Sequence, residues 1–217
     1  MLDCVHYMNT VAMKRDREEA LTLEILEAID RREQVSQRRL ADELGVALGL
    51  ANSYLRRCVR KGLIKIQQAP ANRYVYYLTP QGLAEKSRLT AQYLKSSLDY
   101  YHRAGASIAD CYADMVAAGH RAVAFAGMSE LSEIASIRSH DFPLRVVGTY
   151  DPGATVDRFI GRPVCTNAAE LDCDAVLFTA LANPDTVYAC LNESWPAERI
   201  FVPSIVAPVL RGTGHAH

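Results

Sequence analysis

Residues 36–66 read SQRRLADELGVALGLANSYLRRCVRKGLIKI, and this stretch decides the fold of the first half of the chain. Ser36 is a typical helix N-cap, because its hydroxyl can accept a hydrogen bond from an amide of the first helical turn. Leu40, Ala41 and Leu44 then share one side of a helix. Gly45 follows, and glycine most easily adopts the positive φ that a sharp turn requires. We therefore predict a helix over residues 37–44 and a tight turn after it.

A second helix is predicted over residues 47–61. Ala51, Leu55 and Cys58 recur at spacings of four and three, which places them on one buried stripe. The opposite face is polar and basic: it carries Gly49, Asn52, Ser53, Arg56 and Arg60, with Arg57 and Lys61 on its flank.

Two strand-like runs follow the second helix, at residues 64–66 and 74–78. We expect a polar loop with a proline, residues 67–73, to connect them as a hairpin. Upstream, Leu21, Ile25 and Ile29 mark an amphipathic helix over residues 17–31 that completes a three-helix core. Helix, helix, turn, helix and hairpin are the parts of a winged helix-turn-helix domain, which we place at residues 17–79 after a flexible segment at 1–16.

DNA is the partner that this pattern favours. Residues 36–73 contain eight Lys and Arg against Asp42 and Glu43. In a major groove Arg can bridge two acceptors of guanine, and Asn can pair with adenine. The candidate DNA-binding residues are Arg38, Gly49, Asn52, Ser53, Arg56, Arg57, Arg60, Lys61, Lys65 and Arg73. The alternatives are a solvated helix face and a winged helix that binds protein.

The net charge of −1 hides two halves of opposite sign. Residues 1–105 contain 17 basic and 12 acidic side chains, net +5, whereas residues 106–217 contain 7 and 13, net −6. Only the first half suits a polyanion. No apolar run approaches the roughly 18 residues of a membrane span, and no secretion signal is apparent, so we expect a cytoplasmic protein that does not contact a membrane.

The six cysteines are scattered and form no Cys-x-x-Cys pair, so neither a zinc site nor a disulfide framework is predicted. Cys58 and Cys111 lie on helix stripes and are interpreted as apolar core residues. Cys4, His6, His215 and His217 are assigned to flexible ends. Redox sensing through Cys165, Cys173 or Cys190 stays open.

Thr79 and Pro80 are typical of a helix start, and a long helix is predicted to run to Arg103. Its apolar seam is a candidate dimer surface. It consists of Leu83, Ala91, Leu94, Leu98 and Tyr101. The alternative is that the seam packs on the second domain of the same chain. Gly105 is expected to break this helix before another at residues 108–117, so that residues 80–118 form linker and dimerisation helices.

The second half alternates strands with helices. Apolar runs at residues 122–126, 144–149, 175–178 and 200–202 have strand length, and helical periodicity appears after Gly127 and over residues 183–193. Strands buried on both faces that alternate with helices indicate a parallel, doubly wound sheet. The predicted fold is thus an α+β winged-helix domain joined by a long helix to an α/β Rossmann-like domain with a mostly parallel sheet, at residues 119–206, and a tail at 207–217.

The turn after the first strand of this sheet is a candidate nucleotide site. Glycines there let a backbone approach a pyrophosphate, and an acid after the second strand can accept hydrogen bonds from a ribose. The candidate effector-binding residues are Gly127, Met128, Ser129, Glu130, Ser132 and Asp151. Ser replaces the second and third glycines of the usual pattern, and Glu130 would repel an anion. The alternative is a purely structural sheet.

Residues 37–66 and the wing resemble the winged-helix regulators grouped with the MarR family. Residues 121–203 resemble the small Rossmann-like domain at the head of nucleotide-sugar-modifying and CoA-binding proteins, through the motifs 127–135, Val146-Val147-Gly148-x-x-Asp151 and Gly161-x-Pro163-Val164. The combination is similar to bacterial regulators of the Rex type. The resemblance implies DNA binding under the control of an effector, without identifying that effector.

Three functional hypotheses follow. The leading one is a homodimeric transcription regulator that reads an inverted repeat and binds a nucleotide, nucleotide sugar or dinucleotide, with no metal and no catalytic residues. The second is a constitutive DNA-binding protein whose tail domain is an interaction or dimerisation module. The third is a small Rossmann enzyme fused to a DNA-binding head, although the chain lacks the closing glycine of a nucleophile elbow after Ser129.

Overall fold

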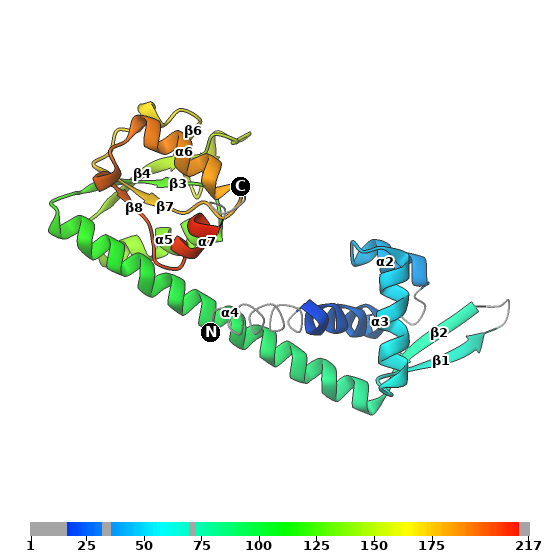
Figure 1. Ribbon diagram of the computed structural model, residues 1–217. Helices are drawn as coiled ribbons and strands as arrows, with labels where there is room; N and C mark the ends of the chain where they lie inside the picture. Colours follow the sequence, from blue (N-terminus) through cyan, green and yellow to red (C-terminus); the bar gives the residue numbers. More distant parts are fainter. Residues whose placement is uncertain (1–16, 32–35, 70–72, 213–217) are drawn as a thin grey trace, which may run out of the picture. The chain divides into compact units, whose positions relative to one another are not determined.

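The computed structural model describes residues 17–31, 36–69 and 73–212. The predictions for Cys4, His6, His215, His217 and the flexible segment 1–16 fall outside these residues. The chain divides into two compact units, residues 1–97 and 98–217, and each is described by itself. Figure 1 labels their elements.

The first unit is a winged helix-turn-helix. It contains a helix at residues 17–30, α2 (Gln37–Glu43), α3 (Leu48–Arg60), β1 (Ile64–Ala69), β2 (Arg73–Leu78) and the first part of α4 (Pro80–Ala117). Its apolar core draws on every one of these elements and contains Ile25, Ile29, Leu40, Leu55, Cys58, Leu63, Ile64, Tyr76 and Leu89. The predicted stripes of the three helices are therefore buried, although Leu21 is only half-buried.

The predicted turn between α2 and α3 is confirmed. The Ser36 hydroxyl accepts a hydrogen bond from the amide of Arg39, at 3.2 Å, and caps α2. Gly45 has a φ of +60°, the left-handed conformation that glycine adopts without steric cost. The turn sets the start of α3 and thereby fixes which side chains of α3 face away from the core.

The wing is a longer hairpin than the sequence predicted. β1 and β2 pair antiparallel from Ile64 with Leu78 to Ala69 with Arg73, so residues 67–69 belong to a strand and not to the loop. The prediction was wrong because Gln67 and Gln68 carry no apolar alternation. In a two-stranded ribbon exposed to solvent, polar side chains are tolerated on both faces.

The helix after the wing begins as predicted but does not break at Gly105. Thr79 accepts a hydrogen bond on its hydroxyl from the amide of Gly82, at 3.0 Å. α4 then runs without interruption to Ala117, so the two predicted helices are one. Gly105 is buried in it, and a Cβ there would lie 2.9 Å from Nε of Arg138. Ala104 and Ile108, on either side of Gly105, are buried in the core of the second unit, and this burial outweighs the roughly 1 kcal/mol that one glycine costs a helix.

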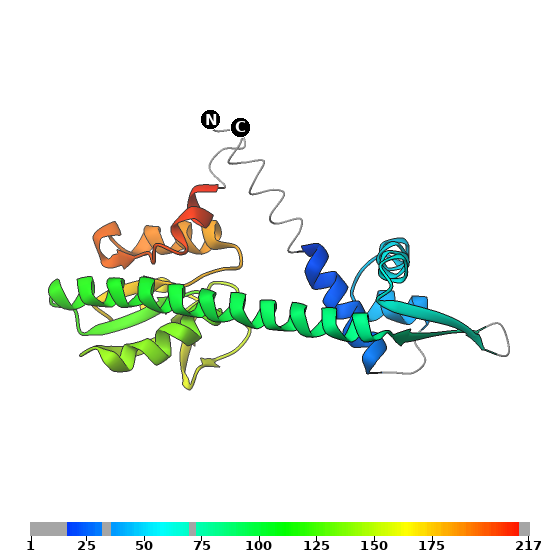
Figure 2. The same ribbon diagram turned by 90° about the horizontal axis from the view of Figure 1, so that it is seen from below.

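The second unit is an α/β layer structure with a six-stranded sheet in the order β5-β6-β4-β3-β7-β8. The strands are β3 (Ala122–Ala126), β4 (Arg145–Tyr150), β5 (Arg158–Phe159), β6 (Arg162–Cys165), β7 (Ala175–Phe178) and β8 (Ile200–Phe201). The helices are α5 (Glu130–Arg138), α6 (Pro184–Ser194) and α7 (Ala207–Gly212), with short 3-10 turns η1 (Ser139–Asp141), η2 (Ala168–Glu170) and η3 (Ala197–Arg199). Figure 2 shows α5 (yellow-green) and α6 (orange) on opposite faces of the sheet.

The sheet is mostly parallel, as predicted, and only β5 runs antiparallel. The sequence did not predict β5 and β6, because these strands are short and lack a continuous apolar run. β3 lies between β4 and β7. The strands that come next in the chain, β4 to β6, extend the sheet on one side of β3, and β7 and β8 extend it on the other side. In doubly wound folds such a switch point is where ligands bind, beyond the carboxyl ends of the strands.

Among the described residues no helix combines the length and the apolar character that crossing a membrane requires.

Candidate nucleic-acid interface

A groove of about 960 Å³ lies between α3 and the wing. It is lined by Gln37, Gly49, Asn52, Ser53, Leu55, Arg56, Val59, Arg60, Ile66, Tyr74 and Tyr76. Five of the candidate DNA-binding residues are in this set, and all five come from α3. The structure therefore brings together the predicted polar face of the second helix in one open concavity.

The α3 wall of the groove is polar and cationic. Arg56 and Arg60 are exposed, one turn apart, and neither has an acidic partner among the residues that the structure describes. Gly49 stands near the start of α3 with no atom within 4 Å of the position its Cβ would take, so a ligand can approach the helix backbone closely there. Two guanidinium groups without an acidic partner among the described residues suit an anionic ligand.

The wing wall of the groove is apolar at its outer end. Ile66 and Tyr74 are 46% and 56% exposed. Ile66 pairs with Tyr76 and Tyr74 with Gln68, so Ile66 and Tyr74 are diagonal neighbours on one face of the hairpin. The base of this wall is the buried Tyr76, whose hydroxyl accepts a hydrogen bond from Nε2 of Gln37 at 3.1 Å. The sequence analysis did not select Ile66 or Tyr74, although strand alternation could have placed both on the helix side of the hairpin.

The other candidate residues lie outside the groove. Arg57 donates to Glu18 at 2.7 Å, and this hydrogen bond, followed by the charge of Glu18, raises the pKa of Arg57. Arg38 is exposed on α2, and Lys61 lines a separate hollow with Glu85 and Arg88.

Two of the predicted residues belong to the wing. Lys65 is exposed and, by strand alternation, lies on the hairpin face away from the groove. Arg73 opens β2, but its side chain is outside the described residues. Lys65 is thus placed to meet a different part of a ligand from the part that enters the groove.

The candidate nucleotide site lies at the switch point of the second unit. Gly127 has a φ of +102°, and a Cβ there would stand 2.4 Å from Cα of Ala180, after β7. Glycine is therefore required here by contact between two turns of the protein. Ser129 caps α5: its hydroxyl accepts from the amide of Leu131 at 3.1 Å, and Ser132 completes a capping box.

The polar groups of this second site already bond to one another. The Ser129 hydroxyl donates to the carbonyl of Thr179 at 2.6 Å, across the switch point. Asp151 accepts hydrogen bonds from the amides of Met128 and Gly153, each at 3.0 Å, so both of its carboxylate oxygens are engaged. Glu130 follows Ser129 in the first turn of α5. A nucleotide at these residues would have to replace several of these bonds.

Burial keeps several cysteines in the thiol form. It raises the pKa of Cys58, of Cys165 and of Cys173, the last to about 12, and the pKa of Cys111 to about 11. A thiolate is the reactive form, so Cys165 and Cys173 are poorly suited to redox sensing at neutral pH. Among the described residues, no three His, Cys, Asp or Glu side chains gather into a metal site.

A family model described as winged helix-turn-helix DNA-binding matches residues 19–65. No curated protein matches the chain.

Solved structures with similarity to the chain include transcription regulators and a methyltransferase. MepR, a transcription regulator of the Staphylococcus aureus multidrug efflux pump MepA, is 21% identical, with 46% of this chain and 82% of MepR covered and a TM-score of 0.35. The MarR family transcription regulator SP03579 is 19% identical, with 51% and 85% covered and a TM-score of 0.34. Human N-acetylserotonin methyltransferase is 11% identical, with 87% and 73% covered and a TM-score of 0.37. At these scores only the family model bears on what the chain does.

Proposed function

We propose that the protein is a DNA-binding transcription regulator that acts as a homodimer and reads an inverted repeat through α3 and the wing. The observation that carries the proposal is the groove between them, whose α3 wall presents Asn52, Arg56 and Arg60 to solvent. The match of residues 19–65 to a DNA-binding family model supports it. In such domains the second helix of the helix-turn-helix enters the major groove.

Side chains on α3 suit both base and backbone contacts. Arg56 has the fork geometry for the two acceptors of guanine, and Asn52 can pair with adenine one turn earlier. We expect Arg38 on α2, and Lys61 and Lys65 beyond α3, to contact phosphates, which fix the register of a protein on DNA without reading its sequence. Arg57 is expected to act mainly through its ion pair with Glu18, which ties α3 to the helix at residues 17–30.

An apolar stripe on α4 supports the homodimer. It runs along one helix face through Leu83, Leu94 and Leu98, which are 47%, 55% and 58% exposed. From residue 91 to 99 every side chain except Gln92 is exposed. Leucines at these spacings face one way, because residues four or eleven apart lie on the same face of a helix. An exposed leucine seam of this kind is stabilised when a second copy covers it.

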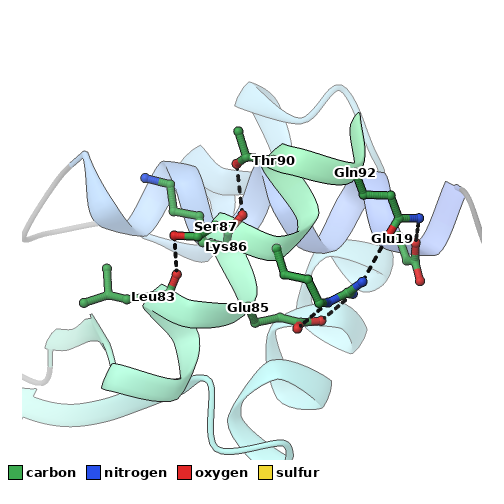
Figure 3. A network of polar contacts seen from close by, with 8 residues as sticks. Glu19, Leu83, Glu85, Lys86, Ser87, Thr90 and Gln92 are labelled. Carbon is green, nitrogen blue, oxygen red and sulfur yellow. Dashed lines mark hydrogen bonds and ion pairs between the residues drawn. The ribbon is translucent and has the colours of Figure 1, made fainter. Parts of the chain in front are cut away.

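Two hydroxyls near this stripe already donate to carbonyls of α4, as Figure 3 shows. The Ser87 hydroxyl donates to the carbonyl of Leu83 at 3.0 Å, and the Thr90 hydroxyl to the carbonyl of Lys86 at 2.9 Å. Covering the stripe would therefore leave the Ser87 and Thr90 hydroxyls with their acceptors.

On another side of α4, a chain of side-chain hydrogen bonds holds the helix in place. Arg88 bonds both Glu85 and Gln92, and Gln92 donates to Glu19 at 2.6 Å (Figure 3). These contacts attach α4 to the helix at residues 17–30, away from the leucine stripe. The stripe therefore remains available to a second copy.

Control by a nucleotide-like effector at Gly127, Ser129 and Asp151 is a separate prediction. A ligand regulates only if it binds one conformation more tightly than another. Here it would have to open the Ser129–Thr179 contact and take over the bonds that Asp151 makes to Met128 and Gly153. The test is a thermal-shift screen of dinucleotides, nucleotide sugars and acyl-CoAs. A stabilising ligand whose shift is lost in Asp151→Ala would support the effector, whereas no shift with any of them would favour constitutive DNA binding.

The test of DNA binding is fluorescence anisotropy with labelled genomic fragments against random duplex, at several salt concentrations. We expect sequence-dependent binding that weakens linearly in log Kd against log salt concentration, because Lys and Arg release counterions from phosphates. Equal affinity for every duplex would leave only non-specific binding, and absence of binding would favour a protein-interaction module.

A further inference from the structure

The groove between α3 and the wing has two walls of unlike chemistry. Asn52, Arg56 and Arg60 line the α3 side, and the exposed Ile66 and Tyr74 line the wing side. Whatever enters the groove meets both walls. The occupant should therefore carry hydrogen-bonding groups and an apolar group next to each other, and negative charge that the two arginines can neutralise.

Asn52 adds a more specific requirement. Its carboxamide oxygen is buried and has no hydrogen-bond donor among the described residues. A buried acceptor without a donor disfavours the free state, so a ligand that supplies a donor gains affinity. Asn52 lines the groove, so a turn of its carboxamide about the Cβ–Cγ bond is the movement by which this oxygen would meet the occupant. The occupant should therefore offer a donor close to its apolar group.

An A·T base pair has this arrangement on its major-groove edge. Adenine offers the N6 amino donor beside the N7 acceptor, which matches the two ends of a carboxamide, and thymine offers its O4 and a C5-methyl group. A G·C pair carries no methyl group on that edge. Arg60 can pair with a phosphate next to this base pair, and Arg56 stays available for the acceptors of a neighbouring guanine.

We propose that this groove reads one A·T pair in each half-site, with Asn52 bonded to adenine and the Ile66–Tyr74 wall in contact with the thymine methyl group. The inference rests on the proposed function, since it assumes that α3 binds DNA. It adds two apolar specificity residues on the wing to the polar residues of α3. The wing then reads a base and does more than hold the sugar-phosphate backbone.

The experiment removes the methyl group from the DNA and the apolar wall from the protein. A duplex that the full-length protein binds is selected from a random library, and each thymine of the selected site is replaced in turn by deoxyuridine, which keeps base pairing and loses only the methyl. We expect one position in each half-site to lose about fourfold in affinity, the effect of burying one methyl group. In Ile66→Ala and Tyr74→Ala, that position should no longer distinguish thymine from uracil.

Tyr77→Ala is the matched control, because Tyr77 is 44% exposed on the opposite face of the same strand and should leave the thymine preference intact. Unchanged melting temperatures show that the variants fold. If every thymine tolerates deoxyuridine while the protein still binds the selected site, the methyl contact does not exist and DNA binding stands. The same holds if Ile66→Ala and Tyr74→Ala weaken thymine and uracil duplexes equally, as contacts to sugars would. If no duplex is selected, the proposed function itself fails.

Discussion

At the scale of single residues, ion pairing separates the cations of α3 into two kinds. Arg57 is held by Glu18. Arg56, the preceding residue, and Arg60 line the groove without an acidic partner among the described residues. The sequence placed all of these side chains on the outer half of the helix but could not show which had a partner. Glu18 and Arg57 are 39 positions apart, and only the fold brings them together.

The first prediction compares Arg56→Ala with Lys65→Ala. We expect Arg56→Ala to cost about 1 to 3 kcal/mol on the selected site and to relax base choice, because Arg56 is placed to contact a base edge. Lys65→Ala should weaken binding to all sequences alike and reduce the salt slope by about one, because Lys65 is placed for a phosphate. Anisotropy titrations on selected and random duplexes distinguish the two. Equal losses on both duplexes for Arg56→Ala would count against base readout.

The second prediction concerns the pH dependence of the second unit. Asp174 accepts hydrogen bonds from the amides of Ala122 and Arg121, both at 2.8 Å, and these bonds lower the pKa of its carboxyl below the ordinary 3.8. A lowered pKa in the folded state means that this carboxylate stabilises the fold above about pH 4 and ceases to do so as the pH falls through the folded pKa.

The melting temperatures of the wild-type protein and of Asp174→Asn should accordingly differ most near pH 7 and converge toward pH 3. The neighbouring exposed Asp172 provides the control, since Asp172→Asn removes a charge of the same sign without these two backbone bonds. A melting difference for Asp174→Asn that stays constant from pH 7 to pH 3 would contradict this assignment.

At the scale of elements, local sequence signals predicted the helices and the central strands well. Ser36, Gly45 and Thr79 mark element ends through chemistry that acts within a few residues, and each performs the expected role. The errors at Gly105 and in the wing have the opposite origin. Whether a helix continues through Gly105 depends on the core of the second unit, in which Ala104 and Ile108 are buried, and the length of the wing depends on pairing between two strands.

The candidate sites divide in the same way. The polar face of α3 follows from helical spacing alone, so Asn52, Arg56 and Arg60 could be selected from sequence. The apolar wall could not be selected with the same ease, because an exposed Ile66 or Tyr74 is indistinguishable in sequence from a core residue of a strand. At the switch point, the sequence located Gly127, Ser129 and Asp151 but could not show that they bond to one another and to Thr179.

The third prediction concerns Gly82, where α4 crosses the residue that precedes the wing. A Cβ at Gly82 would stand 2.0 Å from the backbone oxygen of Leu63, which also accepts a hydrogen bond from the amide of Thr79. Gly82→Ala should therefore destabilise the first unit by about 3 kcal/mol, because neither backbone can yield without losing that bond. Chemical denaturation followed by circular dichroism measures the change.

Gly49→Ala is the comparison for this variant. Gly49 is helical, exposed and has open space around its Cβ position, so alanine should leave stability unchanged or raise it by up to about 1 kcal/mol. If Gly82→Ala were as stable as Gly49→Ala, the contact between α4 and Leu63 would not be as close as described.

At the scale of the whole molecule, the account depends on two copies acting together. A single helix-turn-helix reads only a few base pairs, and dimers gain affinity and specificity by placing two recognition helices on two half-sites. Within each copy, the first half of the chain is basic and the second half is acidic. Only the basic half is expected to attract DNA, which leaves the acidic half for other roles.

The fourth prediction tests the α4 stripe. Replacing Leu94 and Leu98 by serine should dissociate the homodimer, because each buried leucine contributes about 2 kcal/mol per protomer. Sedimentation equilibrium should show a dimer for the wild-type protein and a monomer for the double variant. A cooperative thermal unfolding transition in the double variant would show that the monomer is folded. Asp99→Ser, at an exposed position of α4 outside the stripe, should remain dimeric. A double variant with wild-type self-association would move the dimer contact elsewhere.

The most direct measurement of the central claim is selection of DNA by the full-length protein from a random duplex library at near-physiological salt. We predict enrichment of an inverted repeat whose half-site centres lie about one helical turn, or a small multiple of one turn, apart. Replacing Asn52 and Arg56 together by alanine should abolish that enrichment while non-specific binding persists. Recovery of no motif, or of the same motif by the double variant, would contradict base readout by α3.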